Sequence, residues 1–253
     1  MHSTKVTYPE PMQLSGILDQ YESFQVTPCI GTEFPKANLA EWLSSPNADA
    51  LLRDLAITIV FFRAQTDLDG ELQKELTHRL GVQSGKPAGH RLSKHPLHLI
   101  RKDDPEMGVL DPGRQQKLHG VENTQKRQRA VLEYHSDGSY EVCPPDFTML
   151  RMTEIPPTAR SSLSSATTTT SKSASAGTTP AMLVSTTSKS KPCLTPCLTS
   201  IAIWDNRCVL HCPTQDHYGL GGRMGYRTMG IAEKPYLDPN SPSRQEALAA
   251  AAK

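Results

Sequence analysis

Ser200-Ile-Ala-Ile-Trp-Asp-Asn-Arg-Cys-Val-Leu-His211 is the stretch of this chain that decides the fold. Its apolar run, Ile201–Trp204, is a strand candidate. Other short apolar runs, separated by clusters of Pro, Gly and Asp, are Leu97–Arg101, Phe147–Thr153 and Tyr226–Ile231. Spaced short strands of this kind favour a sandwich or barrel over a parallel α/β sheet.

The first half of the chain combines helical patterns with one further strand pattern. A capping-type residue, Asn47, stands ahead of closely spaced leucines and predicts a helix over Asn47–Ala56. The β-branched and aromatic run Ile57–Phe62 predicts a buried strand. Leucines at i, i+4 and i+8 spacing predict a second helix over Asp69–Leu80 that stops at Gly81. We therefore expect a mainly β fold with flanking helices, of the α+β class.

Charge and hydropathy exclude several classes of partner. The 253 residues carry 27 basic and 26 acidic side chains, so the totals give no basic footprint for nucleic acid or a membrane surface. The longest apolar run, Ile59–Phe62, is far too short to span a bilayer, and the N-terminus lacks the apolar core of a signal peptide. We expect a cytoplasmic protein with a small-molecule substrate and no nucleic-acid or membrane partner. A homo-oligomer stays open.

The composition changes between residues 159 and 199. Ser, Thr, Lys and Pro dominate there, and no aromatic or acidic residue occurs. Such a segment buries too little apolar surface to offset the entropy lost on ordering, so we expect it to be disordered. The expected organisation is one domain in two parts, residues 16–158 and 200–240, with tails at residues 1–15 and 241–253.

Six cysteines raise the question of a bound metal. The absence of a secretory signal favours reduced thiols over disulfides. Four of the cysteines form two pairs with three residues inside each pair, namely Cys193 with Cys197 and Cys208 with Cys212. A zinc-stapled interaction module is therefore one hypothesis, although structural zinc pairs more often use tighter spacing.

A second metal hypothesis rests on His135-Ser-Asp137 and on His211. Residues two apart in an extended strand point to the same side, so the first pair offers an imidazole and a carboxylate together. Two histidines and one carboxylate make the set that holds Fe(II) on one face and leaves positions for a chelating acid and dioxygen. Taken singly, each motif has a plainer explanation, as a surface hydrogen-bonded pair and a packed core histidine.

Longer motifs decide between these explanations. The stretch that starts at Ser200, continued through Asp216, Tyr218, Arg223, Arg227 and Glu233-Lys-Pro-Tyr236, closely resembles the C-terminal signature of the TauD family of 2-oxoglutarate-dependent dioxygenases. The fungal taurine and alkylsulfonate dioxygenase-like branch is the most similar. The resemblance covers most of residues 8–158 and 200–240, and its other motifs are Leu14-Ser-Gly16, Ile30-Gly-Thr-Glu-Phe-Pro35, Val60-Phe-Phe-Arg63, Leu80-Gly81, His95-Pro-Leu97, His135-Ser-Asp137 and Glu154-Ile-Pro-Pro-Thr158.

The resemblance implies a double-stranded β-helix, or jelly roll, with a ferrous site. Fe(II) would be held by His135, Asp137 and His211. Arg223 matches the arginine that grips the distal carboxylate of the co-substrate 2-oxoglutarate, while Arg227 and His95 match positions that contact the substrate sulfonate. A guanidinium suits both anions because it donates paired hydrogen bonds. The implied reaction consumes dioxygen and hydroxylates an alkylsulfonate such as taurine, which releases sulfite and an aldehyde.

The chain departs from the family pattern in its middle. Relatives continue beyond Pro156-Pro-Thr158 with Gly-Gly-Asp-Thr and an aromatic-rich stretch, whereas this chain continues with the Ser/Thr tract. The separation of Asp137 and His211 is also shorter than in typical relatives, so we expect an incomplete jelly roll. A truncated, catalytically inactive relative is therefore the second hypothesis. The tract Ala166–Thr170 is also what codons for Gly-Tyr-Asp-Tyr-Tyr encode when read one nucleotide late; a shifted reading frame and a genuine linker both stay open.

Overall fold

The computed structural model describes residues 12–26, 31–94, 103–111, 134–155, 163–167, 199–213, 222–236 and 249–250. A short 3-10 helix, η1, precedes three α-helices and nine strands in this part of the chain. The helices are η1 (Ile17–Gln20), α1 (Leu39–Ser44), α2 (Ala48–Leu55) and α3 (Gly70–Gln83). The strands are β1 (Phe24–Gln25), β2 (Thr32–Phe34), β3 (Val60–Phe62), β4 (Gly108–Leu110), β5 (Pro145–Glu154), β6 (Leu163–Thr167), β7 (Ser200–Asp205), β8 (Leu210–Pro213) and β9 (Met224–Ile231).

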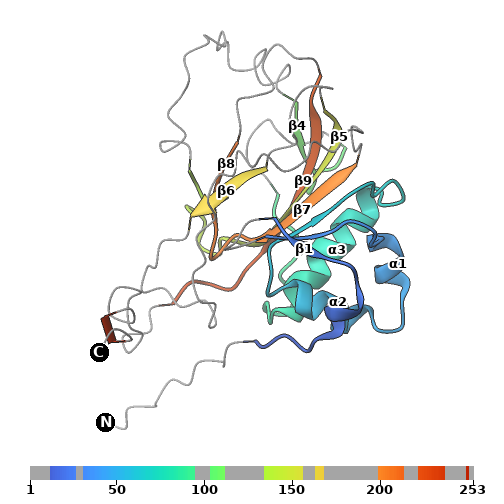
Figure 1. Ribbon diagram of the computed structural model, residues 1–253. Helices are drawn as coiled ribbons and strands as arrows, with labels where there is room; N and C mark the ends of the chain where they lie inside the picture. Colours follow the sequence, from blue (N-terminus) through green and yellow to red (C-terminus); the bar gives the residue numbers. More distant parts are fainter. Residues whose placement is uncertain are drawn as a thin grey trace.

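A seven-stranded sheet forms the centre of the protein (Figure 1). Its strand order is β1-β2-β3-β7-β5-β9-β4, and only β2 and β3 are parallel. Strands β7 and β9, which follow the Ser/Thr-rich segment, lie on either side of β5, which precedes it. Both parts of the chain therefore build one sheet. Strands β6 and β8 pair with each other in a second, smaller sheet.

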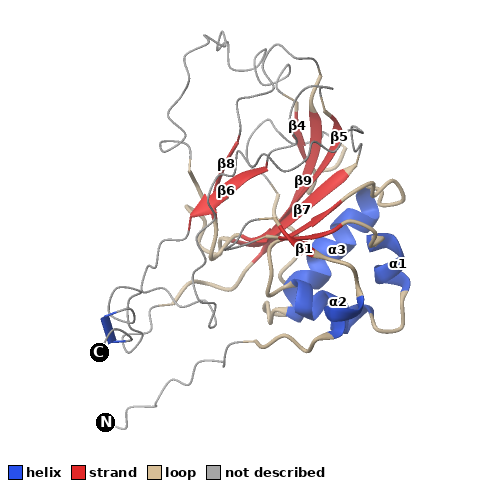
Figure 2. Ribbon diagram, viewed as in Figure 1, coloured by secondary structure: helices blue, strands red, loops and turns tan. Residues whose placement is uncertain are grey.

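The large sheet is covered differently on its two faces. The three α-helices lie against one face, and β6 and β8 lie toward the other (Figures 1 and 2). Alternate side chains of β7 follow this division, because successive residues of a strand point to opposite faces. Ile201 and Ile203 join the helix leucines in the main core, whereas Ala202 and Trp204 belong to a smaller apolar cluster on the opposite face. That second face carries the candidate site.

Aromatic residues fill the centre of the main core. Phe62 of β3 stacks on Phe34 of β2 at 5.6 Å between ring centroids, and Trp42 of α1 meets Phe62 edge-on at 5.7 Å. Burial of a side chain of this size contributes roughly 1.5–3 kcal/mol, so this cluster anchors the helices to the sheet.

Among the residues described, no helix combines the length and apolarity that a bilayer crossing requires.

Most of the elements expected from the sequence are found within a few residues. The helix expected over Asn47–Ala56 is α2, and the strands expected at Phe147–Thr153, Ile201–Trp204 and Tyr226–Ile231 are β5, β7 and β9. The strand expected over Ile57–Phe62 starts only at Val60. The reason is local, since the N–H groups of Ile57 and Thr58 still bond to carbonyls at the end of α2.

Two further expectations fall mostly outside the described residues. Strand β6 lies within the segment expected to be disordered, and its main chain pairs with β8. The rest of that segment up to residue 198 lies outside the described residues, as does the strand expected over Leu97–Arg101. Residues 249–250 are helical within the C-terminal tail.

A buried ion pair lies beside the end of α3. The Nζ of Lys86 is 3.9 Å from Oδ2 of Asp146, and the two side chains are 1% and 0% exposed. Neither of these two atoms has a hydrogen-bond partner in the described structure. Burial raises the pKa of Asp146 to about 6 against the opposing charge of Lys86, and burial also lowers the pKa of Lys86. Desolvation therefore outweighs attraction in this pair.

This pair explains why position 81 is a glycine, although the helix stop predicted there is wrong. Helix α3 continues through Gly81 to Gln83. A Cβ at position 81 would collide with the carboxylate of Asp146 and come within 2.9 Å of the Lys86 Nζ. The glycine is needed for close packing of side chains from elsewhere in the fold, and not as a helix terminator.

We expect Gly81→Ala to lower the free energy of unfolding by about 1–3 kcal/mol, although alanine is the better helix former, because the methyl group overpacks the buried pair. Urea denaturation measures the change. The matched control is Gly70→Ala in the first turn of α3, where a Cβ would meet only Met107 at an ordinary 3.6 Å. A Gly81→Ala protein as stable as the control would contradict this account.

The raised pKa of Asp146 predicts a pH effect on stability. A carboxyl whose pKa rises from 3.8 to about 6 on folding stabilises the protein fully below pH 3.8, and this contribution is lost as the pH rises through 6. In Asp146→Asn the titrating group is gone. Relative to wild type, the variant should therefore gain up to about 3 kcal/mol between pH 4 and pH 7. Urea denaturation at each pH tests this, and a stability difference that is constant across the range would refute it.

Candidate metal centre

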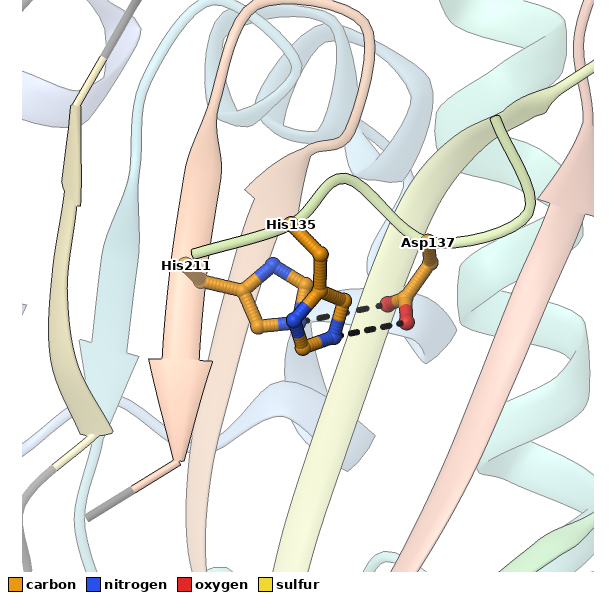
Figure 3. Close-up of side chains that lie close together, drawn as sticks. All are labelled: His135, Asp137 and His211. Carbon is orange, nitrogen blue, oxygen red and sulfur yellow. Dashed lines mark ion pairs between the residues drawn. The ribbon is translucent and has the colours of Figure 1, made fainter. Parts of the chain in front are cut away.

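Three side chains meet on the sheet face opposite the helices (Figure 3). His135, Asp137 and His211 each offer a ligand atom, and these atoms lie within 4.8 Å of one another. The Nε2 of His135 is 3.8 Å from Oδ1 of Asp137, and the Nε2 of His211 is 3.6 Å from Oδ2. Figure 3 shows both imidazoles turned toward the same carboxylate. No other group of three metal-ligating side chains occurs among the residues that the structure describes.

Main-chain hydrogen bonds hold the two histidines side by side. The N–H of His135 donates to the carbonyl of His211, the N–H of His211 donates back to the carbonyl of His135, and both distances are 2.8 Å. These two hydrogen bonds form the closely spaced pair of an antiparallel β-bridge. Gly138, at φ 57°, then turns the chain directly after Asp137, where a Cβ would lie 2.9 Å from Cδ of Pro145.

The carboxylate of Asp137 is buried and ionised. Burial alone would raise the pKa of Asp137, but the charge of Arg227 above all, together with a hydrogen bond from Thr148, holds it below the ordinary 3.8. Arg227 Nη1 donates to Oδ1 at 2.7 Å, and the Thr148 hydroxyl donates to Oδ2 at 3.2 Å. At neutral pH the site therefore presents an anionic oxygen ligand.

His211 is held neutral. Burial lowers the pKa of His211 to about 4 although Asp137 opposes the shift, and the charges of His135 and Arg227 lower it further. The indole of Trp204 packs against the imidazole at 4.8 Å between ring centroids. The side chain of His135 is 47% exposed, against 13% for His211, so the site opens to solvent on the His135 side.

This donor set fits a ferrous ion. Two imidazole nitrogens and one carboxylate oxygen come from one bridge and the loop beside it, and within the described part of the chain no further metal-ligating side chain joins them. The carboxylate is charged and His211 carries no competing proton, as metal binding requires. The arrangement can hold Fe(II) and still leave positions for a bidentate acid and dioxygen.

The strand register explains how Arg227 reaches the site. Arg227 in β9 stands opposite Leu150 in β5, and Thr148 lies two residues earlier in β5. Residues two apart share a face, so Thr148 and Arg227 both point to the face that carries Asp137. Arg223 lies directly before β9.

The structure tests few of the other residues singled out from the sequence. His95, expected at the substrate, and Cys193 and Cys197 of the zinc hypothesis all lie outside the described residues. Cys208 donates a weak hydrogen bond from Sγ to the carbonyl of Asp205 at 3.5 Å. The zinc module therefore stays a prediction.

Sequence reasoning missed three contributors to the site. These are Thr148, the ion pair that Arg227 makes with Asp137, and Asn206, whose side chain bonds to the main chain of Asp137. The first two depend on strand register, which the sequence does not display. The sequence offers one indication for Asn206, because it is a polar residue directly after a buried strand in the stretch that starts at Ser200.

Comparison with known proteins identifies the fold family. The family model described as taurine catabolism dioxygenase TauD, TfdA family, matches residues 22–168. The alpha-ketoglutarate-dependent dioxygenase oryG of Aspergillus oryzae is 64% identical over 341 residues, an alignment that covers 100% of both chains. The chain belongs to the TauD/TfdA family. The alpha-ketoglutarate-dependent dioxygenase btcD of Neocamarosporium betae is 33% identical over 333 residues, with 94% of this chain and 98% of btcD covered.

A taurine dioxygenase from Burkholderia xenovorans shares the fold of this TauD/TfdA protein. The two structures superpose with a TM-score of 0.54 at 17% identity, over 88% of this chain and 94% of the other. The expected jelly roll is confirmed. Dioxygenases of this family use Fe(II) and 2-oxoglutarate, so the expected metal and co-substrate are confirmed as well.

The alignment with oryG also bears on the short middle of this TauD/TfdA chain. It runs over 341 residues, more than the 253 residues present here, so oryG contains stretches that have no counterpart in this chain. Such a difference agrees with the short separation of Asp137 and His211. The three candidate ligand side chains, His135, Asp137 and His211, nevertheless meet.

Removal of Arg227 should destabilise the metal-free protein. We expect Arg227→Gln to lower the free energy of unfolding by about 3–5 kcal/mol, because it leaves the buried Asp137 carboxylate without its cation. Urea denaturation in the presence of a chelator measures this loss. Arg79→Gln is the matched control; its partners Asp49 and Glu75 are 69% and 51% exposed, so its loss should stay below about 1 kcal/mol. Equal losses in the two variants would disprove the special role of the Arg227 pair.

Proposed function

We propose that this chain is an alkylsulfonate dioxygenase that holds Fe(II) through His135, Asp137 and His211. The convergence of these side chains, with an ionised carboxylate and a neutral His211, is the observation that carries the proposal. Bound iron, supplied with 2-oxoglutarate and dioxygen, would provide the oxidant for a substrate C–H bond. The residues of the chain bind and orient the reactants.

In this proposal Arg223 and Arg227 bind two different anions. Arg223 would hold the distal carboxylate of 2-oxoglutarate, and Arg227, with His95, would hold the sulfonate of the substrate. Support for Arg227 comes from its place beside Asp137, since an anion bound there would lie next to the metal ligands. Paired N–H donors of a guanidinium match the oxygens of both anions.

The product chemistry follows from the position of the sulfonate. Hydroxylation of the carbon that carries the sulfonate gives an α-hydroxysulfonate, which breaks its C–S bond to yield an aldehyde and sulfite. The co-substrate loses carbon dioxide and becomes succinate, so each turnover consumes one dioxygen molecule. The Burkholderia protein that shares this fold is a taurine dioxygenase, so the fold is compatible with this substrate class.

The apolar residues near His211 suit this reaction. Trp204, Leu150 and Val209 form a buried cluster on the same sheet face as the ligands. A wall of this kind keeps water from one side of the site and strengthens the electrostatic contacts within it. Entry of substrate would then come from the side of His135, the exposed ligand.

Sulfite release from a panel of alkylsulfonates, taurine included, tests the proposal. With Fe(II), 2-oxoglutarate and dioxygen present, we expect equal amounts of sulfite and succinate from at least one sulfonate. Asp137→Ala should form neither product, because the site loses its anionic ligand. Succinate without sulfite would refute the sulfonate assignment while the dioxygenase activity stood.

An anaerobic titration with Fe(II) and 2-oxoglutarate separates the active enzyme from the inactive relative. An assembled site gives the weak visible charge-transfer band of the iron chelate. Folded protein that gives no band would refute the ligand assignment and favour the inactive relative, which the short middle of the chain also supports.

A further inference from the structure

Asn206 lies in the turn between β7 and β8, where the two ligand-bearing segments meet. It is 2% exposed. Its Nδ2 donates to the main-chain carbonyl of Asp137 at 2.6 Å, and its Oδ1 accepts from the main-chain N–H of Asp137 at 2.9 Å. One side-chain amide thus satisfies both main-chain groups of a single residue, as a neighbouring strand would.

The main chain of Asn206 adds two more links. Its N–H donates to the carbonyl of Asp146 at 2.6 Å, and its carbonyl accepts from the Ser136 hydroxyl at 2.7 Å. Asn206 therefore joins the loop of His135 and Asp137 to the start of β5. The turn that carries Asn206 leads directly into β8 and His211.

The turn itself is rigid. The carboxylate of Asp205 accepts from Arg207 through the main-chain N–H at 2.9 Å, Nε at 2.9 Å and Nη2 at 2.8 Å. A second ion pair holds Arg207 to Glu233 at 3.1 Å, with the Arg207 side chain only 13% exposed. Asn206 stands between these two fixed residues, so its amide has a fixed direction.

We propose that Asn206 is a positioning residue, which sets where the Asp137 carboxylate lies relative to His211 and thereby sets the affinity for Fe(II). The inference rests on the proposed ligand roles of Asp137 and His211. Without the amide, the buried N–H and carbonyl of Asp137 lose their partners, and the loop shifts to find others. Outer partners of this kind typically change metal affinity by about 10- to 100-fold.

Asparagine is the residue that this position requires. Alanine removes both hydrogen bonds, whereas aspartate keeps an acceptor for the N–H of Asp137 but loses the donor to its carbonyl. Glutamine is longer by one methylene in a site with almost no exposed surface. The three substitutions thus damage the clamp in different ways.

Anaerobic titration of the full chain with Fe(II) in the presence of 2-oxoglutarate tests the inference, with the charge-transfer band as the readout. We expect Asn206→Ala to raise the Kd for Fe(II) by about 10- to 100-fold. A thermal melt of each metal-free protein accompanies the titration, so that lost affinity is separated from lost stability.

Gln65→Ala is the matched control. Gln65 is also a buried amide, 4% exposed, that links separate segments. It accepts from the N–H of Leu39 at 2.8 Å and donates to the carbonyls of Ala37 and Arg63 at 2.7 Å each. Its loss should lower the melting temperature and leave the Kd for Fe(II) unchanged.

The outcomes separate the two proposals. A wild-type band combined with equal Kd values for Asn206→Ala and Gln65→Ala overturns the positioning role alone. A wild-type protein without a band overturns the proposed function and this inference with it. If Asn206→Ala does not fold, Asn206→Asp carries the same comparison, and failure of both to fold would show a general structural role instead.

Discussion

The reciprocal main-chain hydrogen bonds between His135 and His211 are the constraint on which the site depends. They place two imidazoles side by side although the residues are far apart in the sequence. The entropic cost of closing a loop grows only slowly with loop length. A middle segment of quite different length can therefore connect the same two ends, so the ligands meet in a chain shorter than its alignment with oryG.

The charges around Asp137 favour the binding of a metal cation. Arg227 balances the carboxylate from the sheet side, and His211 stays neutral because it is buried. The separation of roles matters, because a metal needs an anionic oxygen and an unprotonated nitrogen at the same pH. Burial alone would raise the pKa of Asp137, and the charge of the Arg227 guanidinium opposes that shift. One buried cation, Arg227 of β9, thus helps to keep the Asp137 carboxylate ionised.

Much of the architecture is predictable from local patterns, and the site only in part. Apolar runs located β5, β7 and β9, because a strand buried on both faces shows itself in composition. Motifs named His135, Asp137 and His211, which the structure brings together. The pair of Arg227 with Asp137 was not predictable, because it depends on the register between β5 and β9. The helix end predicted at Gly81 is wrong for a related reason. The glycine leaves room for the Asp146 carboxylate and does not terminate the helix.

The strand order has a consequence for how the polypeptide is made. Strand β7 lies between β3 and β5, and β9 lies between β5 and β4, so each earlier strand pairs with a neighbour that is synthesised later. On the ribosome, β3, β4 and β5 therefore emerge with open edges that stay uncovered until β7 and β9 have been made. Uncovered edges invite pairing with other chains, so nascent copies of this protein are open to such pairing until β7 and β9 have been made.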